Sequence, residues 1–308
     1  MRISTANAYA TTIDTLQQRQ QQLSRTQEQL SSGKRVARAS DDPVAAARIE
    51  RALATAARSD ADQRALEASR SAMQQSEAAL GDAGELLQRV RELMVAAGNG
   101  SYIDSDRAKI GQEIAGLRAQ LLAVANRGDG AGGFLFGGQG SAEPPFSDGI
   151  GGVQFNGTAG RTEVQGGDRL PLTMDGAAAW LGAGSAADPS APAPSVFDVL
   201  DRTVAELRSA NRSSAQVAQT VQTGLRDIDA SLSNLQQQRT TAGESLKHID
   251  NAESRLADTK LHAQTQRSLA EDLDLVQALS DFQNRQTGYE AALKAYSMVQ
   301  RLSLLQYL

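Results

Sequence analysis

Two histidines are the side chains in this sequence with the most obvious potential for metal or acid–base chemistry. His248 and His262 are the only histidines in 308 residues, and they stand fourteen positions apart. On one helix that separation corresponds to about 21 Å, which is too far for both rings to ligate the same metal ion. We therefore interpret both as solvated side chains. Because the chain contains no cysteine, disulfides, thiolate metal sites and a cysteine nucleophile are excluded as well.

A glycine-rich run at Gly128–Gly133 matches the letters of the dinucleotide motif GxGxxG. That motif binds phosphate where a strand leads into it and a helix leaves it, because the phosphate then meets a helix N-terminus. Here a helical pattern precedes the run and a strand-like segment follows it. The run is therefore interpreted as a loop, and the sequence predicts no cofactor.

Two charged clusters could also bind ligands, but both have a simpler interpretation. Asp41 and Asp42 are adjacent carboxylates directly before Pro43, a combination that favours the start of a helix. The basic side chains within 34–38 surround a turn, and a solvated turn explains them better than a phosphate site does. The sequence thus predicts no metal site and no enzyme, since a catalytic cluster would have to be assembled by the tertiary fold alone.

Composition limits the possible partners. The formal net charge is −5 and the estimated pI is 5.2, which argues against binding to nucleic acid. No apolar run approaches the roughly 18–20 residues of a transmembrane helix, and the N-terminal residues lack the apolar core of a secretory signal. We therefore expect no nucleic-acid partner and no membrane insertion and, on these grounds alone, a cytosolic protein.

Proline and glycine divide the chain into two helical stretches and a centre that cannot be helical. None of the seven prolines lies within 44–143 or 195–308, whereas 17 of the 27 glycines fall between 128 and 184. Both residue types interrupt helices, so long helices are expected only on either side of the centre. Within the centre, short strand-like segments are expected at 134–136, 153–155 and 162–164.

Apolar residues recur at helical spacing on both sides of that centre. In the terminal segments they recur every seven residues, and the same interval is found at Leu66, Met73, Leu80, Leu87 and Met94. Such stripes form the seams of coiled coils. In the N-terminal segment the other seam position holds Thr12, Arg19 and Thr26, so this seam buries little apolar area, and residues 1 to about 35 and about 268 to 308 are expected to order only on assembly. The residues predicted to form the assembly interface are Tyr9, Leu16, Leu23, Leu30, Leu275, Leu279, Phe282, Tyr289, Leu293 and Tyr296.

Local chemistry marks several helix ends. Gly33 can adopt the left-handed conformation that follows a helix C-terminus, and Asp42 can cap a helix that begins at Pro43. Ser195 and Asp198 have the spacing of a capping box at the start of a later helix.

Together these signals predict a mainly α fold: an elongated, coiled-coil-like helical rod formed by the N- and C-terminal halves, with a small β insert domain. Terminal coiled-coil helices are expected at 1–38 and 266–308. A helical rod domain is expected from 39–127 and 195–265, and a small Gly/Pro-rich β domain with its linker from 128–194. The chain would leave and return along the rod, so that both termini lie at the same end.

Several motifs carry a family resemblance. The N-terminal MRIST, the LSSGKRV at Leu30–Val36 and the ASDDP at Ala39–Pro43 resemble the start of bacterial flagellin-type proteins, and DLVQAL at Asp274–Leu279 resembles the matching C-terminal region. Within that group, the run GFLFGG at Gly133–Gly138 is similar to the entry to the central domain of the hook–filament junction family of hook-associated proteins.

This resemblance implies a structural, non-enzymatic protein of the bacterial flagellum, an adaptor at the hook–filament junction on which flagellin polymerises. The implied partners are another hook-associated protein on the hook side, flagellin on the filament side, further copies of the chain in a ring, and a flagellar export chaperone on the C-terminal helix. It also implies an extracellular location, reached through the flagellar type III export system without a cleaved signal peptide. A flagellin filament subunit and a cytosolic coiled-coil adaptor remain the alternatives.

Overall fold

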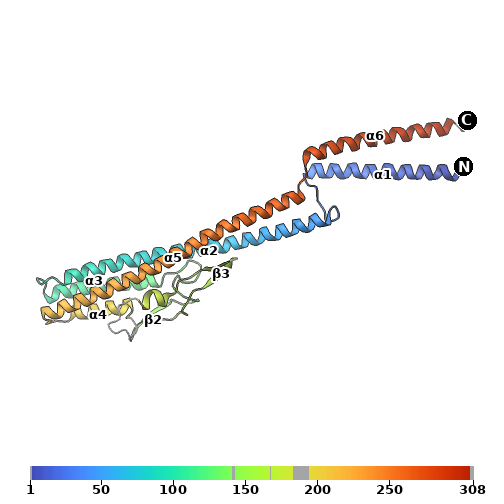
Figure 1. The fold of residues 1–308 in the computed structure, drawn as a ribbon. Coiled ribbons are helices and arrows are strands. Elements are labelled where there is room, and N and C mark those ends of the chain that lie inside the picture. The colour runs from blue at the N-terminus through green and yellow to red at the C-terminus, as the bar shows by residue number, and fades with distance from the viewer. Residues whose placement is uncertain (1, 141–142, 167, 183–193, 306–308) are drawn as a thin grey trace. The chain divides into compact units, whose positions relative to one another are not determined.

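The computed structural model describes residues 2–140, 143–166, 168–182 and 194–305, and the side chains of 10–140, 143–163, 168–182 and 194–298. Most of these residues are helical, with a small strand region between the two helical halves, so the predicted fold class is confirmed (Figure 1). The helices are α1 (Arg2–Ser32), α2 (Pro43–Ala97), α3 (Asp104–Ala125), the π-helical turn η1 (Ala177–Leu181), α4 (Val196–Arg208), α5 (Ser214–Glu271) and α6 (Leu275–Leu305). The strands are β1 (Phe146–Gly149), β2 (Gly152–Phe155), β3 (Glu163–Gly166) and β4 (Asp168–Pro171).

The chain divides into two compact units. The first, which we call the terminal unit, comprises 1–59 and 257–308, and the second, the central unit, comprises 60–256. Helices α2 and α5 each contribute to both units. The predicted three-part division, with a separate β domain at 128–194, stays a prediction.

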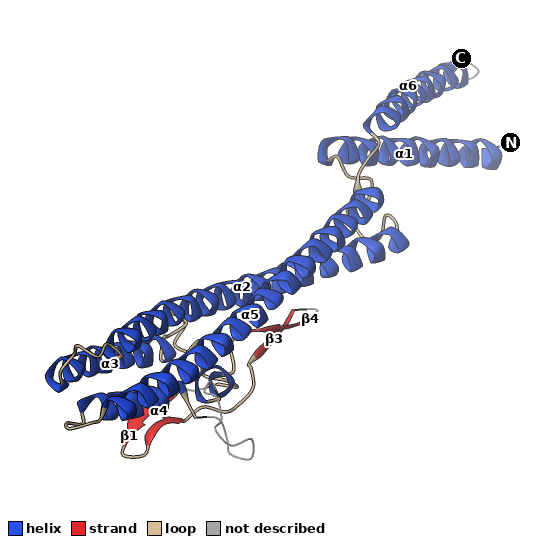
Figure 2. Cartoon of the chain, turned by 60° about the vertical axis from the view of Figure 1, so that its left-hand side comes forward, coloured by secondary structure: helices blue, strands red, loops and turns tan. Residues whose placement is uncertain are grey.

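The central unit holds the main hydrophobic core. The apolar residues of α2 that recur at intervals of seven, which we call the α2 stripe, are buried there, and side chains from α3, α4 and α5 complete the core. Helices α3 and α4 pack against each other, with the strands beside the helices (Figure 2). The residues of the α2 stripe with almost no exposed surface are Met73, Leu80, Leu87 and Met94.

The strand region consists of two separate antiparallel pairs. β1 pairs with β2, with Phe146 opposite Phe155, and β3 pairs with β4. Aromatic rings join this region to the helices, because Trp180 of η1 lies 5.2 Å from Phe136 and 6.3 Å from Phe197 of α4 between ring centroids. The strand region therefore shares the core of the helices that it packs against.

One predicted strand is wrong. Residues 134–136 form a single bridge, between Phe134 and Gly128, followed by a turn. The turn leads to Gly138, whose φ is +66° and where a side chain would collide with the Thr158 carbonyl. Because the chain must turn here, its apolar residues point inward without pairing as a strand.

The predicted helix ends are confirmed. Gly33 follows α1 with φ of +69°. The Asp42 carboxylate accepts hydrogen bonds from the amides of Val44 and Ala45, and the Ala45 bond, followed by that from Arg35, lowers the pKa of Asp42. At α4, Ser195 and the third helical residue form the expected capping box.

Candidate assembly surface

Within the terminal unit, helices α1 and α6 form an antiparallel pair. Their direction follows from three contacts: residue 34 bridges residue 272, residue 26 meets residue 285, and residue 19 meets residue 288. The N-terminal end of α1 and the C-terminal end of α6 therefore lie at the same end of the pair, as Figure 1 shows.

The pairing divides nine of the ten predicted interface residues into two groups. The first group is half-buried in the pair and consists of Leu16, Leu23 and Leu30 on α1 with Phe282, Tyr289 and Tyr296 on α6. Tyr9 belongs to α1, but its side chain lies outside the described residues. None of these positions is tested as an intermolecular contact by a single chain, and that role stays a prediction.

The second group is exposed. Leu275, Leu279 and Leu293 are 57%, 52% and 42% exposed, although the sequence pattern placed them on the same seam. Their spacing puts them on one face of α6, while the smaller Ala278 is buried instead. With exposed Val276 beside them, these leucines form an uncovered apolar face, which we call the α6 stripe.

Polar contacts across the pair were missed from sequence. Arg285 of α6 donates to the Gln22 carbonyl at 3.3 Å and to the Thr26 hydroxyl at 3.0 Å, and Thr26 is buried. In return, Arg19 of α1 donates to the Gly288 carbonyl of α6 at 3.3 Å. Arg19 and Thr26 are two of the three polar seam positions noted above, so the signal was present but indicated only a sparse seam.

A compact polar junction joins this pair to the adjoining ends of α2 and α5. The buried Glu271 carboxylate pairs with Arg267 and Lys34, each at 2.5 Å, and both hydrogen bonds, that of Arg267 first, lower the pKa of Glu271. The Glu271 carbonyl accepts from the Arg35 amide at 2.7 Å, and the Leu273 amide donates to the Gly33 carbonyl. This backbone pairing interrupts the helical path at 272–274.

The basic cluster at 34–38 belongs to this junction. Lys34 pairs with Glu271, Arg35 pairs with Asp42 at 3.2 Å, and Arg38 pairs with Glu28 at 2.8 Å. Each cation is thus matched by a carboxylate of the same chain, which accounts for the cluster without a phosphate ligand.

The other residues considered for chemistry lie apart. His248 and His262 are both exposed on α5. In the glycine-rich run the Asp129 carboxylate accepts from the amides of Ala131 and Gly133, which forms a closed loop with no helix after it. Within the described residues, no group of three potential ligands is arranged to hold a metal ion, and none of the helices there could cross a bilayer.

Comparison with known proteins decides the family. Residues 3–141 match the bacterial flagellin N-terminal helical region, and residues 225–308 match the bacterial flagellin C-terminal helical region. The flagellar hook-associated protein 3 of Escherichia coli (strain K12) is 30% identical over 329 residues, in an alignment that covers 99% of each chain. The chain belongs to the hook-associated protein 3 family.

Two further comparisons show a shared fold and a partial sequence similarity. A flagellar hook-associated protein from Vibrio parahaemolyticus has the same fold, with a TM-score of 0.64 at 20% identity over 75% of this chain and 99% of that one. Flagellin of Bacillus subtilis is 34% identical, but only over 41% of this chain and 42% of its own. The hook-associated protein 3 family is a structural family, so the chain is a component of the bacterial flagellum that associates with other flagellar components.

Proposed function

We propose that the chain is the adaptor between hook and filament. Copies would form a ring whose hook side meets another hook-associated protein and whose filament side offers the surface on which flagellin polymerises. The full-length similarity to a hook-associated protein 3, against the partial similarity to flagellin, supports this role over that of a filament subunit.

The observation that carries the proposal is the uncovered α6 stripe. The seam of this helix pair is only half-buried, and a second apolar face of α6 is exposed. Contacts with neighbouring subunits would bury this apolar surface and remove it from water. Packing of the terminal pairs of several subunits side by side would cover Leu275, Leu279 and Leu293. We therefore assign the ten predicted interface residues to contacts between subunits.

Before assembly the same stripe is an aggregation hazard. We propose that the chain leaves the cell through the flagellar export channel without a cleaved signal, and that an export chaperone covers α6 by taking its apolar face into a groove. Because α1 and α6 are expected to order only on assembly, the α6 residues that face α1 would also be open in the free chain, and Phe282→Asp should weaken chaperone binding in calorimetry. Ile150→Asp, which changes an exposed apolar residue in the central unit, is the control, and equal binding of both variants and the natural chain would contradict the assignment.

A deletion strain tests the proposed role directly. Without the gene, hooks should persist, filaments should be missing, and flagellin monomer should accumulate in the medium. Filaments of normal length in the deletion strain would refute the proposal.

Two measurements separate the alternatives. Immunogold labelling should mark a single point next to the hook, whereas a filament subunit would be labelled along the whole filament. Sheared appendages should contain the protein, whereas a cytosolic coiled-coil adaptor would stay in the cell fraction.

A further inference from the structure

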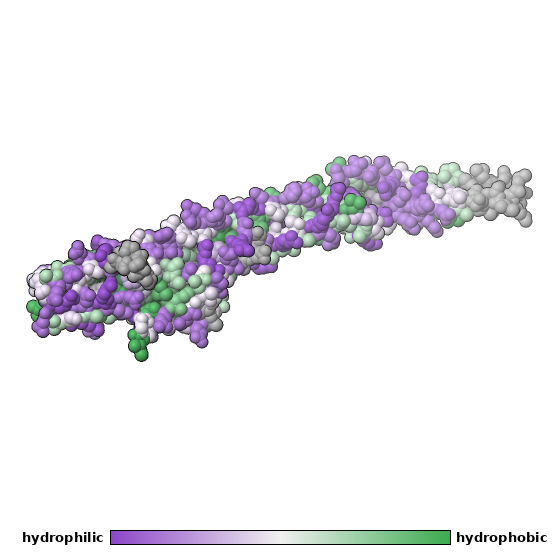
Figure 3. Space-filling view, turned by 60° about the horizontal axis from the view of Figure 1, so that its bottom comes forward, coloured by the Kyte–Doolittle hydropathy of each residue, from purple (hydrophilic) through white to green (hydrophobic). Residues whose placement is uncertain are grey.

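The turn between β1 and β2 presents a single bare apolar side chain. Ile150 is 112% exposed relative to an extended reference, the most exposed of the large apolar residues that the structure describes. Gly149 and Gly151 flank it with ordinary φ angles, and a side chain at either would meet nothing closer than 3.8 Å. Conformation and space therefore do not require glycine at 149 or 151, and Ile150 has no side chain on either neighbouring residue. Figure 3 shows one strongly hydrophobic protrusion on the face that it draws, next to a paler hydrophobic patch.

The turn is held firmly at its base. Arg118 of α3 pairs with Asp148 of β1 at 2.6 Å and with Asp201 of α4 at 2.6 Å, and its guanidinium lies 5.9 Å from the Phe197 ring centre. Two carboxylates thus fix the hairpin to two helices through one largely buried cation. A rigid support of this kind reduces the ordering cost when an exposed side chain binds a partner.

The surroundings of Ile150 carry excess negative charge. The shallow surface around the turn is lined by Asp148, Asp198 and Asp201, with Arg118 as the one cation. Three carboxylates against one guanidinium leave two negative charges, and the paired Asp148 and Asp201 side chains are each 45% exposed. The turn therefore combines an apolar tip with an acidic rim.

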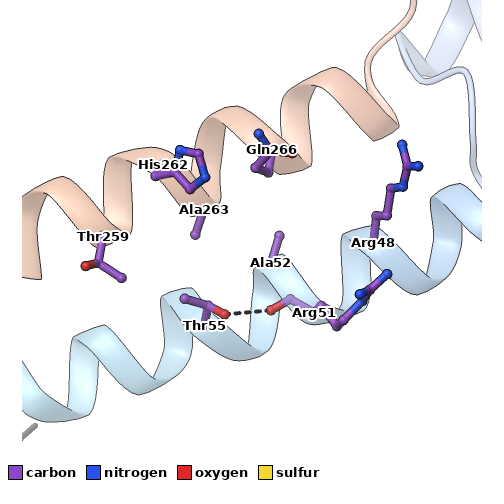
Figure 4. Close-up of a pocket in the computed structure, with 8 residues that line it drawn as sticks. All are labelled: Arg48, Arg51, Ala52, Thr55, Thr259, His262, Ala263 and Gln266. Carbon is purple, nitrogen blue, oxygen red and sulfur yellow. Dashed lines mark hydrogen bonds between the residues drawn. The ribbon is translucent and has the colours of Figure 1, made fainter.

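A groove with the opposite character lies in the terminal unit, between α2 and α5. Figure 4 shows Ala52 and Ala263, both buried, pointing toward one another across the floor of the groove. Arg48, Arg51 and His262 line its rim, and the lining residues include no carboxylate. Arg51 donates its Nε only to the Ala47 carbonyl of its own helix, and Arg48 makes no salt bridge within the described part of the chain.

We propose that the hairpin turn of one copy docks into this groove on a neighbouring copy. Ile150 would lie on the alanine floor, and the acidic rim of the hairpin would face Arg48 and Arg51. Charge complementarity of this kind selects the partner and fixes the register. The proposal deepens the proposed ring and rests on it.

The contact uses two different surfaces, so each copy can give one contact and receive another. Such head-to-tail contacts close into rings or continue as helical arrays. One turn in one shallow groove buries little area and binds weakly alone. Repetition around a ring, together with the α6 stripe contacts, would make it effective.

Engineered cysteines test the contact cleanly because the chain has none of its own. In the deletion strain, Ile150→Cys and Thr55→Cys are co-expressed with different tags, and purified flagella are oxidised. Thr55 is an exposed residue of the groove lining. The expected product is a disulfide-linked dimer that carries both tags. In the matched control, Ala57→Cys replaces Thr55→Cys, because residue 57 is exposed two positions further along α2, on the other face of the helix.

The outcomes separate the inference from the proposed function. A two-tag dimer several-fold more abundant with Thr55→Cys than with Ala57→Cys supports docking. Equal yields, or no such dimer in flagella that contain both variants, overturn it even where filaments are restored. If the deletion strain already makes normal filaments, the proposed function fails instead. Ile150→Asp gives a second measurement: it should leave Trp180 fluorescence unchanged and lower the amount of protein retained on sheared flagella, and full retention would contradict docking.

Discussion

The central and terminal units share helices α2 and α5, but the side chains buried inside the two units differ in size. The core of the central unit contains large side chains, among them Met73, Leu80 and Trp180. In the terminal unit the buried cluster consists of Val36, Ala45 and Ala270, with Ile49 packed against it. The central unit therefore buries many more large apolar side chains than the terminal unit does.

This difference in apolar burial leads us to expect that the central unit is stable in the free chain and that the terminal unit depends on contacts with neighbours. Burial contributes roughly 25 cal/mol per Å² of apolar surface, whereas ordering costs about 1–2 kcal/mol of backbone entropy per residue. A unit packed mainly with alanines and polar contacts is marginal by this comparison, and neighbours can supply the missing area. The following predictions test the comparison, from the largest effect on the free energy of unfolding to the smallest.

The largest loss is expected in the aromatic core of the central unit. Phe197→Ala removes a buried ring in contact with Trp180 and should lower the free energy of unfolding by about 3–5 kcal/mol. Urea unfolding followed by the fluorescence of Trp180, the only tryptophan, measures the change. Phe282→Ala in the terminal unit is the control and should shift the same transition by less than about 1 kcal/mol; equal losses would refute the contrast.

A smaller loss is expected from Arg118→Met. Without the guanidinium, Asp148 and Asp201 lose their cation, but both are partly exposed, so the expected cost is about 1–3 kcal/mol. Arg118 lowers the pKa of Asp148, so this stabilisation is complete above the unfolded pKa of about 3.9 and is lost as the pH falls through the lowered folded value. Urea unfolding at pH 7 and near pH 3 should show a flatter pH dependence for the variant, and an unchanged slope would contradict the pairing.

A local effect is expected at the polar junction. Glu271→Gln removes the charge that Lys34 and Arg267 share and should lower the local opening free energy around 268–275 by about 1 kcal/mol. Since the pKa of Glu271 is lowered in the folded chain, the natural junction should lose this stabilisation as the pH falls through that lowered value, and the variant should not. Hydrogen exchange at several pH values measures both. Identical profiles for the two proteins would show that the carboxylate contributes nothing.

The smallest effect is expected in the terminal pair. In the free subunit at low concentration, amides of Leu16–Leu30 and Phe282–Tyr296 should exchange almost as fast as in an unstructured chain, because the seam is marginal. Leu23→Ala should therefore change the unfolding of the central unit by less than about 0.5 kcal/mol. Strong protection of these amides in the monomer would instead indicate a stable intramolecular coiled coil.

Features governed by neighbours in sequence could be predicted. Gly33, Asp42 and the Ser195–Asp198 capping box act within one helical turn, and all three were correct. Seven-residue spacing also identified the α2 stripe that fills the central core. The mainly helical class with a small strand region followed from the same local signals.

Features set by tertiary packing could not be predicted. The division of α6 into a half-buried and an open face depends on where α1 lies, so Leu275 and Phe282 look alike in the sequence. The end of α5 at Glu271 was missed as well, because backbone pairing with the segment after α1 interrupts the helix there. The following helix, α6, begins at Leu275 directly after Asp274, whose carboxylate accepts hydrogen bonds from the amides of Val276 and Gln277.

The continuity of α2 and α5 through both units has a kinetic consequence. Starting a helix is slow and unfavourable, but extending one adds a hydrogen bond for each residue fixed. Once the central unit has folded, helical order can grow along α2 back to Pro43 and along α5 forward to Glu271 without a new nucleus. It cannot cross 33–42 or 272–274, where the chain leaves the helical path. Helices α1 and α6 must therefore nucleate separately. In the proposed assembly a subunit would arrive with its central unit folded and would form these two helices on contact with its neighbours.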